Sequence, residues 1–320
     1  MTRKVVGVFS KCSEFDDYSA ERSIFNGRDI EIVGVNDANE FDALKGRFDA
    51  LILTNAKITG EVMDSMPRCK VICRHGQGFD NIDVPEATSR GIKICNVPGF
   101  NTDEVSDHAL AFALMLGRNI PFYSHEVKVN HVWGFNSFPA NVKISEMNLA
   151  LLGFGRISRR LAEKARPLFG RVASYDPFMD VDAARRIGVE IYDDIDSLIK
   201  NADILSVHVP LSKDTYHLIG AEKLAIMKPT AYLINCARGA LVDNDALNDA
   251  LENGRLAGAA VDVVEPEPAP KEHVLYNQKK CVVTPHVAWY SSTAIKRMRT
   301  EAANSALAVF DGLEPEGSVN

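Results

Sequence analysis

Short aliphatic runs alternate with amphipathic stretches along the whole chain. This is the pattern of parallel sheets whose strands are joined by helical crossovers, so it predicts the α/β class. In the first hundred residues we expect strands at Lys4–Phe9, Ile30–Val35, Ala50–Thr54, Lys70–Cys73 and Ile92–Cys95. Five strands with intervening helices indicate a small flavodoxin-like domain.

A second series of strands begins near Asn148. It predicts a complete doubly wound sheet with strands at Leu149–Leu152, Val172–Tyr175, Val189–Tyr192, Ile204–His208, Ala231–Cys236, Ala259–Val263 and Val282–Thr284. Between the two series, Pro98 and Gly99 interrupt the chain and indicate a hinge. We expect Thr102 to cap the helix that follows, and Gly117 to end it as a C-terminal cap.

The C-terminal part predicts one long helix. Apolar residues recur at helical spacing over residues 293–310, and the helix should end at Gly312. The segment Glu314-Pro-Glu-Gly beyond it is expected to be frayed.

Length and composition narrow the classes of protein. A chain of 320 residues favours two domains, each with its own core. The net charge of -7 is spread along the chain, and without a clustered basic face nucleic acid is not an expected partner. The sequence contains no stretch of membrane-spanning length and no apolar run long enough for a signal peptide, so we expect a cytoplasmic protein with no membrane partner.

The six cysteines are not spaced as metal ligands. None forms a CxxC pair, and most lie in or beside aliphatic runs; they are Cys12, Cys69, Cys73, Cys95, Cys236 and Cys281. Reduced cysteines in the core of a cytosolic protein are the favoured interpretation, and no metal site is expected.

A glycine-rich turn follows the first strand of the second series. The strand runs directly into Gly153-Phe154-Gly155-Arg156-Ile157-Ser158, which opens an amphipathic helix. Gly153 permits a tight turn, and Gly155 lets the backbone approach a pyrophosphate at the helix N-terminus. Ser158 replaces the third glycine and weakens the match. Glycine turns also connect ordinary strands and helices, so the turn alone does not decide between the two interpretations.

Asp176 ends the next strand, about 20 residues past the glycines. A carboxylate there accepts hydrogen bonds from the adenosine ribose, although a solvated aspartate at a strand end is the alternative. No arginine follows directly in Asp176–Asp180 to neutralise a 2′-phosphate, so we expect NAD rather than NADP.

Three segments at later strand ends carry polar residues that a core does not need: Asn235–Gly239, Asp262–Pro268 and Thr284–Trp289. Ligands of doubly wound sheets bind outside the carboxyl ends of the strands. Reduction of a 2-oxo acid needs a cation for the carboxylate, an acid for the carbonyl oxygen and a group that keeps this acid charged. Arg238, His286 and Glu267 meet these needs. Taken singly, Arg238 could be a surface ion-pair partner and His286 a satisfied loop histidine.

These residues also resemble the D-isomer-specific 2-hydroxyacid dehydrogenases, a family that includes phosphoglycerate, glycerate, D-lactate and formate dehydrogenases and the C-terminal binding protein corepressors. The matching motifs extend over essentially the whole chain: Arg74-His-Gly-Gln-Gly-Phe-Asp-Asn-Ile-Asp83, Asn96-Val-Pro-Gly-Phe-Asn-Thr102, the glycine turn, His208-Val-Pro-Leu-Ser-Lys-Asp-Thr215 and the three polar segments. The resemblance implies that Arg238 binds the substrate carboxylate and carbonyl, that His286 is the general acid/base, and that Glu267 hydrogen-bonds His286.

The resemblance also implies the binding residues. Cofactor NAD is expected to contact Thr102, Gly153, Gly155, Arg156, Ile157, Asp176, Val209, Pro210, Thr215, Cys236, Ala237 and Asp262. The substrate, a small anionic 2-hydroxy or 2-oxo acid, is expected at Arg74, Gln77, Gly78, Arg238 and Trp289.

The family architecture implies two Rossmann-like doubly wound domains. Residues 1–98 plus 288–320 are expected to form a discontinuous substrate-binding domain, and residues 99–287 the NAD-binding domain, with hinges near Pro98 and Val287. A homodimer is expected through a helical arm from Val105 to Ala140 that includes Trp133.

The substrate is the least determined part. An arginine at position 74 can favour a phosphate, which makes 3-phosphoglycerate the leading candidate, but Arg74 tied to a neighbouring carboxylate is an equal alternative. The other candidates are a glyoxylate or hydroxypyruvate reductase and a non-catalytic NAD(H)-sensing corepressor. Ser158, Asp107 and Trp289 depart from the family pattern, and Trp289 could instead close the pocket over a smaller group.

Overall fold

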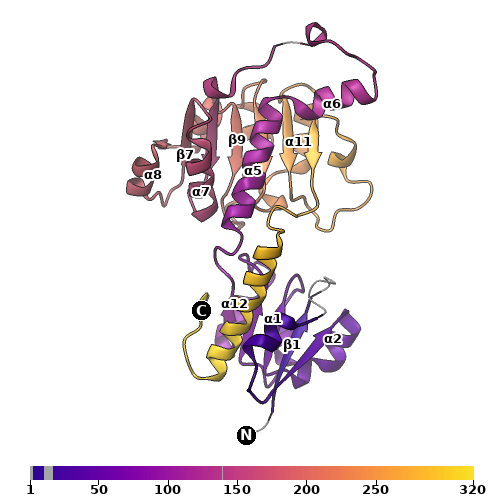
Figure 1. Ribbon diagram of the computed structural model, residues 1–320, viewed down its shortest axis with the longest axis vertical. Helices are drawn as coiled ribbons and strands as arrows, with labels where there is room; N and C mark the ends of the chain where they lie inside the picture. Colours follow the sequence, from indigo (N-terminus) through magenta and orange to yellow (C-terminus); the bar gives the residue numbers. More distant parts are fainter. Residues whose placement is uncertain (1–2, 11–16, 139) are drawn as a thin grey trace. The chain divides into compact units, whose positions relative to one another are not determined.

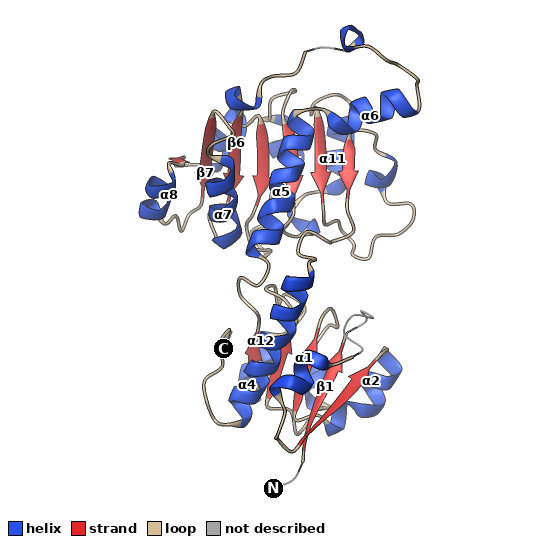
Figure 2. Ribbon diagram, in the orientation of Figure 1, coloured by secondary structure: helices blue, strands red, loops and turns tan. Residues whose placement is uncertain are grey.

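The computed structural model describes residues 3–10, 17–138 and 140–320 (Figures 1 and 2). Within it the chain divides into two compact units. Unit 1 comprises residues 1–100 and 291–320, and unit 2 comprises residues 101–290. Cys12 lies outside the described residues.

Unit 1 is a parallel sheet covered by helices. Its strands are β1 Lys4–Phe9, β2 Ile30–Val35, β3 Ala50–Leu53, β4 Val71–Arg74 and β5 Lys93–Cys95. Its helices are α1 Ser19–Ile24, α2 Ala38–Leu44, α3 Gly60–Asp64, α4 Val84–Ser89 and α12 Ser292–Phe310, with a 3-10 turn, η2, at Lys45–Arg47. The strand order β2-β1-β3-β4-β5 is the flavodoxin-like order, which confirms the prediction.

The predicted C-terminal helix is present as α12, and a buried charge network joins it to α1. The Arg299 guanidinium donates to both oxygens of Glu21, from Nε at 3.1 Å and from Nη2 at 2.6 Å. Both side chains are almost fully buried, so each charge needs the other. This ion pair ties the last helix of the chain to the first one.

The expectation that the end of the chain is frayed is wrong. The tail pairs with β5 through an antiparallel bridge between Ser318 and Cys95, and Val319 N–H donates to the Ile94 carbonyl at 2.9 Å. The Asn320 side chain accepts from the Ile94 N–H at 2.8 Å. The physical reason is that β5 is an edge strand, whose free backbone groups the tail satisfies.

Unit 2 is a larger parallel sheet. Its strands are β6 Asn148–Leu152, β7 Arg171–Tyr175, β8 Glu190–Ile191, β9 Ile204–Val207, β10 Tyr232–Asn235, β11 Gly258–Val261 and β12 Cys281–Val283. They lie in the order β12-β11-β10-β9-β6-β7-β8, the doubly wound arrangement that the sequence predicts. The chain reverses its direction of winding between β6 and β9, where the carboxyl ends of such sheets form a crevice.

Helices cover both faces of this sheet (Figure 2). The helices are α5 Thr102–Gly117, α6 Ile120–Lys128, α7 Arg156–Ala165, α8 Val181–Ile187, α9 Ile195–Asn201, α10 Ala221–Ala225 and α11 Asn244–Glu252, and the 3-10 turns are η3 Phe135–Ser137, η4 Ile144–Glu146, η5 Gly239–Leu241 and η6 Val274–Asn277. One core cluster holds buried side chains of α5, α7 and α8, and the other holds those of α9, α10 and α11. The sheet is therefore the middle of three layers.

Two details of α5 differ from the expectation. Asn101 precedes the helix as its N-cap residue, and Thr102 is already its first helical residue. Gly117 is the last helical residue and is buried. A Cβ there would lie 2.7 Å from the Ile144 side chain, so a larger residue would not fit. The left-handed residue after the helix is Asn119, with φ of 52°. The glycine thus permits close packing rather than reversing the chain.

Across the described residues, no helix is both long and apolar enough to cross a bilayer.

Candidate active site

The glycine turn between β6 and α7 has the geometry of a dinucleotide-binding turn. Gly153 has φ of 96°, and a Cβ on it would lie 2.9 Å from the His208 carbonyl, so only glycine fits between the ends of β6 and β9. A Cβ on Gly155 would meet nothing within 4 Å. The space over Gly155 is therefore open to a ligand that approaches the backbone.

Ser158 has a defined place beneath the turn. Its buried hydroxyl donates to the Gly153 carbonyl at 2.6 Å. Where a third glycine would give close packing, the serine supplies a hydrogen bond that holds the turn. The departure from the glycine pattern therefore leaves the turn intact.

Asp176 is fixed to the same turn. Its carboxylate accepts from Phe154 N–H at 2.7 Å and from Phe178 N–H at 2.8 Å. A cation that the sequence does not reveal, Arg159 of α7, lies at the same turn and donates to the Phe154 carbonyl at 3.0 Å. Arg159 also pairs with Asp180 at 2.9 Å, so its charge is already matched by a carboxylate.

These features fit NAD. The first turn of α7 has no side-chain cap, so the amides of Arg156 and Ile157 point toward the open space with the positive end of the helix dipole. The Asp176 carboxylate is of the kind that would bind the ribose hydroxyls of NAD and repel a 2′-phosphate.

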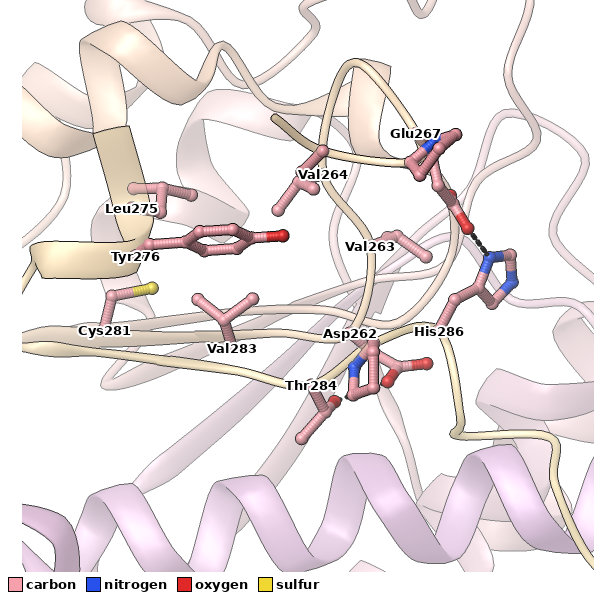
Figure 3. Close-up of a pocket in the computed structure, with 13 residues that line it drawn as sticks. Asp262, Val263, Val264, Glu267, Leu275, Tyr276, Cys281, Val283, Thr284 and His286 are labelled. Atoms are coloured by element: carbon pink, nitrogen blue, oxygen red, sulfur yellow. Dashed lines mark hydrogen bonds and ion pairs between the residues drawn. The ribbon is translucent and has the colours of Figure 1, made fainter. Parts of the chain in front are cut away.

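Glu267 and His286 form a hydrogen-bonded pair, Oε1 to Nδ1, as Figure 3 shows. Glu267 lies in the loop after β11 and His286 in the loop after the neighbouring β12, so the sheet brings the two together. His286 has φ of 55°, a left-handed conformation that is uncommon for a non-glycine residue.

Asp262 imposes that conformation. It is only 1% exposed, and its backbone carbonyl accepts from His286 N–H at 2.7 Å. Its carboxylate accepts from Val287 N–H at 3.0 Å and from Ala288 N–H at 2.8 Å, and also from the Thr284 hydroxyl. The residue expected to contact the cofactor therefore holds the loop that carries His286.

Arg238 is positioned by Asn235, which the sequence analysis named without a role. The Asn235 amide donates to the Arg238 carbonyl at 2.8 Å, and its oxygen accepts from Ala237 N–H at 3.0 Å. A Cβ on Gly239 would lie 2.0 Å from the Val264 carbonyl oxygen. Glycine at 239 thus lets the Arg238 segment approach the loop that carries Glu267.

The remaining cofactor candidates lie around these loops. The Thr215 hydroxyl donates to the Pro210 carbonyl at 2.7 Å and accepts from Ser212 N–H at 2.7 Å, which closes the loop after β9 that includes Val209. Burial, together with the charge of Asp262, raises the pKa of the Cys236 thiol well above its usual value. Cys236 is therefore a neutral thiol.

A pocket of about 500 Å³ adjoins the Glu267–His286 pair (Figure 3). Glu267 and His286 line one end, while Leu275, Tyr276 and Cys281 line the other. Among the described residues, no cluster of histidine, cysteine or carboxylate side chains could hold a metal ion.

Three substrate candidates belong to unit 1. Arg74 Nη1 donates to the His75 carbonyl at 2.7 Å, and a Cβ on Gly76 would lie 1.4 Å from that nitrogen. The guanidinium therefore folds over its own loop. The Gln77 side chain accepts from Gly99 N–H at 3.3 Å, and Gly78 follows in the same loop. Trp289 lies in unit 2, edge-on to Tyr290 with ring centroids 5.3 Å apart.

Sequence comparison decides the family. The profile of the D-isomer specific 2-hydroxyacid dehydrogenase NAD-binding domain matches residues 110–288. The chain belongs to the D-isomer specific 2-hydroxyacid dehydrogenase family. Membership makes it an NAD-dependent oxidoreductase of 2-hydroxy acids.

Relatives in this family differ in substrate. The chain is 40% identical to a glyoxylate reductase of Thermofilum pendens over 85% of this chain and 81% of that protein. It is 36% identical to D-3-phosphoglycerate dehydrogenase of Bacillus subtilis over 91% of this chain, and spans 55% of that enzyme's length. A D-lactate dehydrogenase from Aquifex aeolicus complexed with NAD and lactic acid superposes with a TM-score of 0.85 at 26% identity, covering 96% of each chain.

Proposed function

We propose that this 2-hydroxyacid dehydrogenase reduces a small 2-oxo acid such as glyoxylate or hydroxypyruvate with NADH. The observation that carries the proposal is the Glu267–His286 pair at the ends of neighbouring strands. A histidine whose Nδ1 faces a carboxylate presents its other ring nitrogen, Nε2, for proton transfer.

Each residue of the set has a distinct part. NAD(H), when bound, supplies or accepts the hydride. In the reductive direction protonated His286 gives its Nε2 proton to the carbonyl oxygen, and Glu267 stabilises the imidazolium before the transfer. Arg238 supplies a planar, doubly donating cation for the substrate carboxylate. In oxidation the same histidine, now neutral, takes the hydroxyl proton.

The conformation of Arg74 supports a small substrate. Its guanidinium is engaged by the His75 carbonyl and packs over Gly76, so in this conformation it is turned toward its own loop. The 40% identity to a glyoxylate reductase, over most of both chains, points the same way.

A second candidate substrate is 3-phosphoglycerate, which the sequence analysis placed first. Arg74 favours it, because a long side chain can change rotamer and offer its guanidinium to a phosphate. The similarity to D-3-phosphoglycerate dehydrogenases, 36% for the one from Bacillus subtilis, also favours it.

The test compares glyoxylate, hydroxypyruvate and phosphohydroxypyruvate with NADH, for the unmodified enzyme and for Arg74→Ala. We expect the phosphorylated acid to have the lowest kcat/KM and Arg74→Ala to have no selective effect on it. A phosphorylated acid that is the best substrate, and that alone loses kcat/KM in Arg74→Ala, would establish the second candidate. Tight NADH binding without turnover of any 2-oxo acid would favour a corepressor-like protein.

We further propose that unit 1 binds the substrate and unit 2 binds NAD, and that the protein is a cytoplasmic homodimer. The helical arm was expected from Val105 to Ala140, and its residues 120–138, which comprise α6 and the segment after it, project from the body of unit 2 (Figure 1). We call residues 120–138 the arm below. It exposes several large apolar side chains, namely Ile120, Phe122, Val127, Val129, Trp133 and Phe135. An exposed apolar set of this size on one segment is typical of an interface. The described cysteines are all free thiols, which suits a reducing compartment.

A further inference from the structure

His108, in the middle of α5, is a histidine that neither the motifs nor the proposed chemistry uses. Its side chain is 24% exposed, and its Nε2 lies 3.2 Å from the Thr284 hydroxyl oxygen and 3.9 Å from Asp262 Oδ1. The ring packs edge-on against Phe112 one turn later, with centroids 4.4 Å apart. Packing and hydrogen bonding thus direct His108 from the helix toward the ends of β11 and β12.

The donors and acceptors available show which group donates in the hydrogen bond between His108 and Thr284. Ionised Asp262 can only accept, so the single hydroxyl hydrogen of Thr284 is directed to Asp262 Oδ1. The Thr284 oxygen must then accept from His108, which requires a proton on Nε2. The result is a chain of donation from His108 through Thr284 to Asp262.

Asp262, the last acceptor in this series of hydrogen bonds, holds the loop that carries His286. Asp262 holds Val287 and Ala288 through its carboxylate and His286 through its backbone carbonyl. If Thr284 turned its hydroxyl away, Asp262 would lose one of its hydrogen-bond donors inside a buried site. An underbonded buried carboxylate is costly, so it would draw in water or reorient and carry the loop with it.

We propose that His108 is a positioning residue for the general acid. Acting through Thr284 and Asp262, it holds His286 in its left-handed conformation with Nδ1 against Glu267. This rests on the proposed role of His286 in proton transfer. His108 itself is assigned no contact with substrate.

The test uses two substitutions at position 108. His108→Leu keeps an apolar side chain of helical propensity and removes the donor, while His108→Gln retains a nitrogen donor near the position of Nε2. For a 2-oxo acid and NADH, we expect His108→Leu to lower kcat roughly tenfold, the size of effect expected for one lost hydrogen bond. KM for the 2-oxo acid should stay close to that of the unmodified enzyme, and the melting temperature should fall by no more than the loss of one hydrogen bond predicts. His108→Gln should recover most of kcat.

Thr284→Val supplies an independent test. It removes the hydroxyl that links His108 to Asp262 and leaves the histidine unchanged. We expect it to lower kcat like His108→Leu, and the double variant to lose little more than either single variant. Three results would overturn the proposal. The first is a loss of kcat in the double variant that equals the sum of the two single losses, and the second is an unchanged kcat in His108→Leu. The third is that His108→Gln loses as much kcat and as much melting temperature as His108→Leu.

Failure of the underlying function gives a different result. If His286→Ala keeps full turnover, His286 is not the proton donor, whatever the His108 variants do. If His286→Ala is inactive and His108→Leu is unaffected, only the positioning role fails.

Discussion

Glu267 and His286 are 19 residues apart in the chain, and they meet because their loops follow adjacent strands. Sequence reasoning proposed both side chains from their types and their place after strands. It did not identify what holds them. The bonds from Asp262 to the His286 loop, and the approach of Arg159 to the glycine turn, depend on how neighbouring elements are packed, which no local pattern encodes.

The pairing predicts the effect of Glu267→Gln on turnover. In reduction His286 donates its Nε2 proton, while the Glu267 carboxylate contacts Nδ1 and orients the ring. Glutamine keeps a hydrogen-bond partner for the ring but removes the negative charge, so we expect kcat for a 2-oxo acid to fall by at least about tenfold while the Kd for NADH changes little. The measurements are kcat and the Kd for NADH in both proteins. An unchanged kcat would contradict the role of Glu267.

At the scale of elements, hydrophobic patterning predicted each strand of both sheets to within a few residues. The errors lie at ends, where the pattern is silent. Gly117 is of the residue type expected at a helix C-cap, but a glycine is needed there because of the close contact with Ile144. The left-handed conformation is adopted by Asn119 instead. Whether a glycine is required for close packing or for its backbone conformation depends on the atoms around its Cα, which the sequence does not show.

Two glycines at strand ends should therefore respond differently to alanine. In Gly239→Ala the new methyl meets the Val264 carbonyl, so we expect a loss of about 1–3 kcal/mol of stability together with misplacement of Arg238. In Gly155→Ala the methyl enters open space, so the melting temperature should hold while NADH binding weakens.

Thermal unfolding and NADH titration of the two variants separate these effects. Loss of stability in Gly155→Ala with unchanged NADH affinity would contradict the proposed phosphate site.

At the scale of the whole molecule, the discontinuous first unit did not follow from the hydrophobic pattern, which predicts elements in chain order. It was expected only from the family resemblance. The last helix belongs to the first unit because α12 buries an apolar face there, and the Arg299–Glu21 ion pair joins it to α1. Because Glu21 and Arg299 are far apart in the sequence, local patterns cannot predict this contact.

The arm predicts the oligomeric state. Trp133 and Phe135 are 87% and 95% exposed, so we expect them to be covered by a second copy of the chain. Trp133→Asp should shift the dimer toward monomer in light scattering coupled to size-exclusion chromatography. The matched control is Phe178→Asp, a similarly exposed aromatic residue at 92% that lies outside the arm. A shift in the control alone, or a monomeric unmodified protein, would contradict the arm as the interface.

Acid should destabilise the fold through His75. Burial, with the nearby charges of Arg299 and Arg74, lowers the pKa of His75 from 6.5 to about 3. Because the folded pKa lies below the unfolded one, this contribution to stability is complete above pH 6.5 and is lost as the pH falls from there toward 3. Between about pH 7.5 and about pH 5 the loss should be about 2 kcal/mol.

His75→Gln removes this titration, and His131→Asn, at an exposed histidine, serves as the control. Urea unfolding at several pH values should show a flatter pH dependence for the first variant only. Equal slopes for all three proteins would contradict a neutral buried His75.

The tail along β5 also bears on how the protein is handled in solution. With Ser318 and Val319 bound to the strand, one edge of the unit 1 sheet is closed to other chains. A chain shortened at Gly317 would present the unpaired groups of β5 and become prone to self-association without any change in its core. We therefore expect the pairing of Ser318 and Val319 with β5 to limit edge-to-edge association of unit 1.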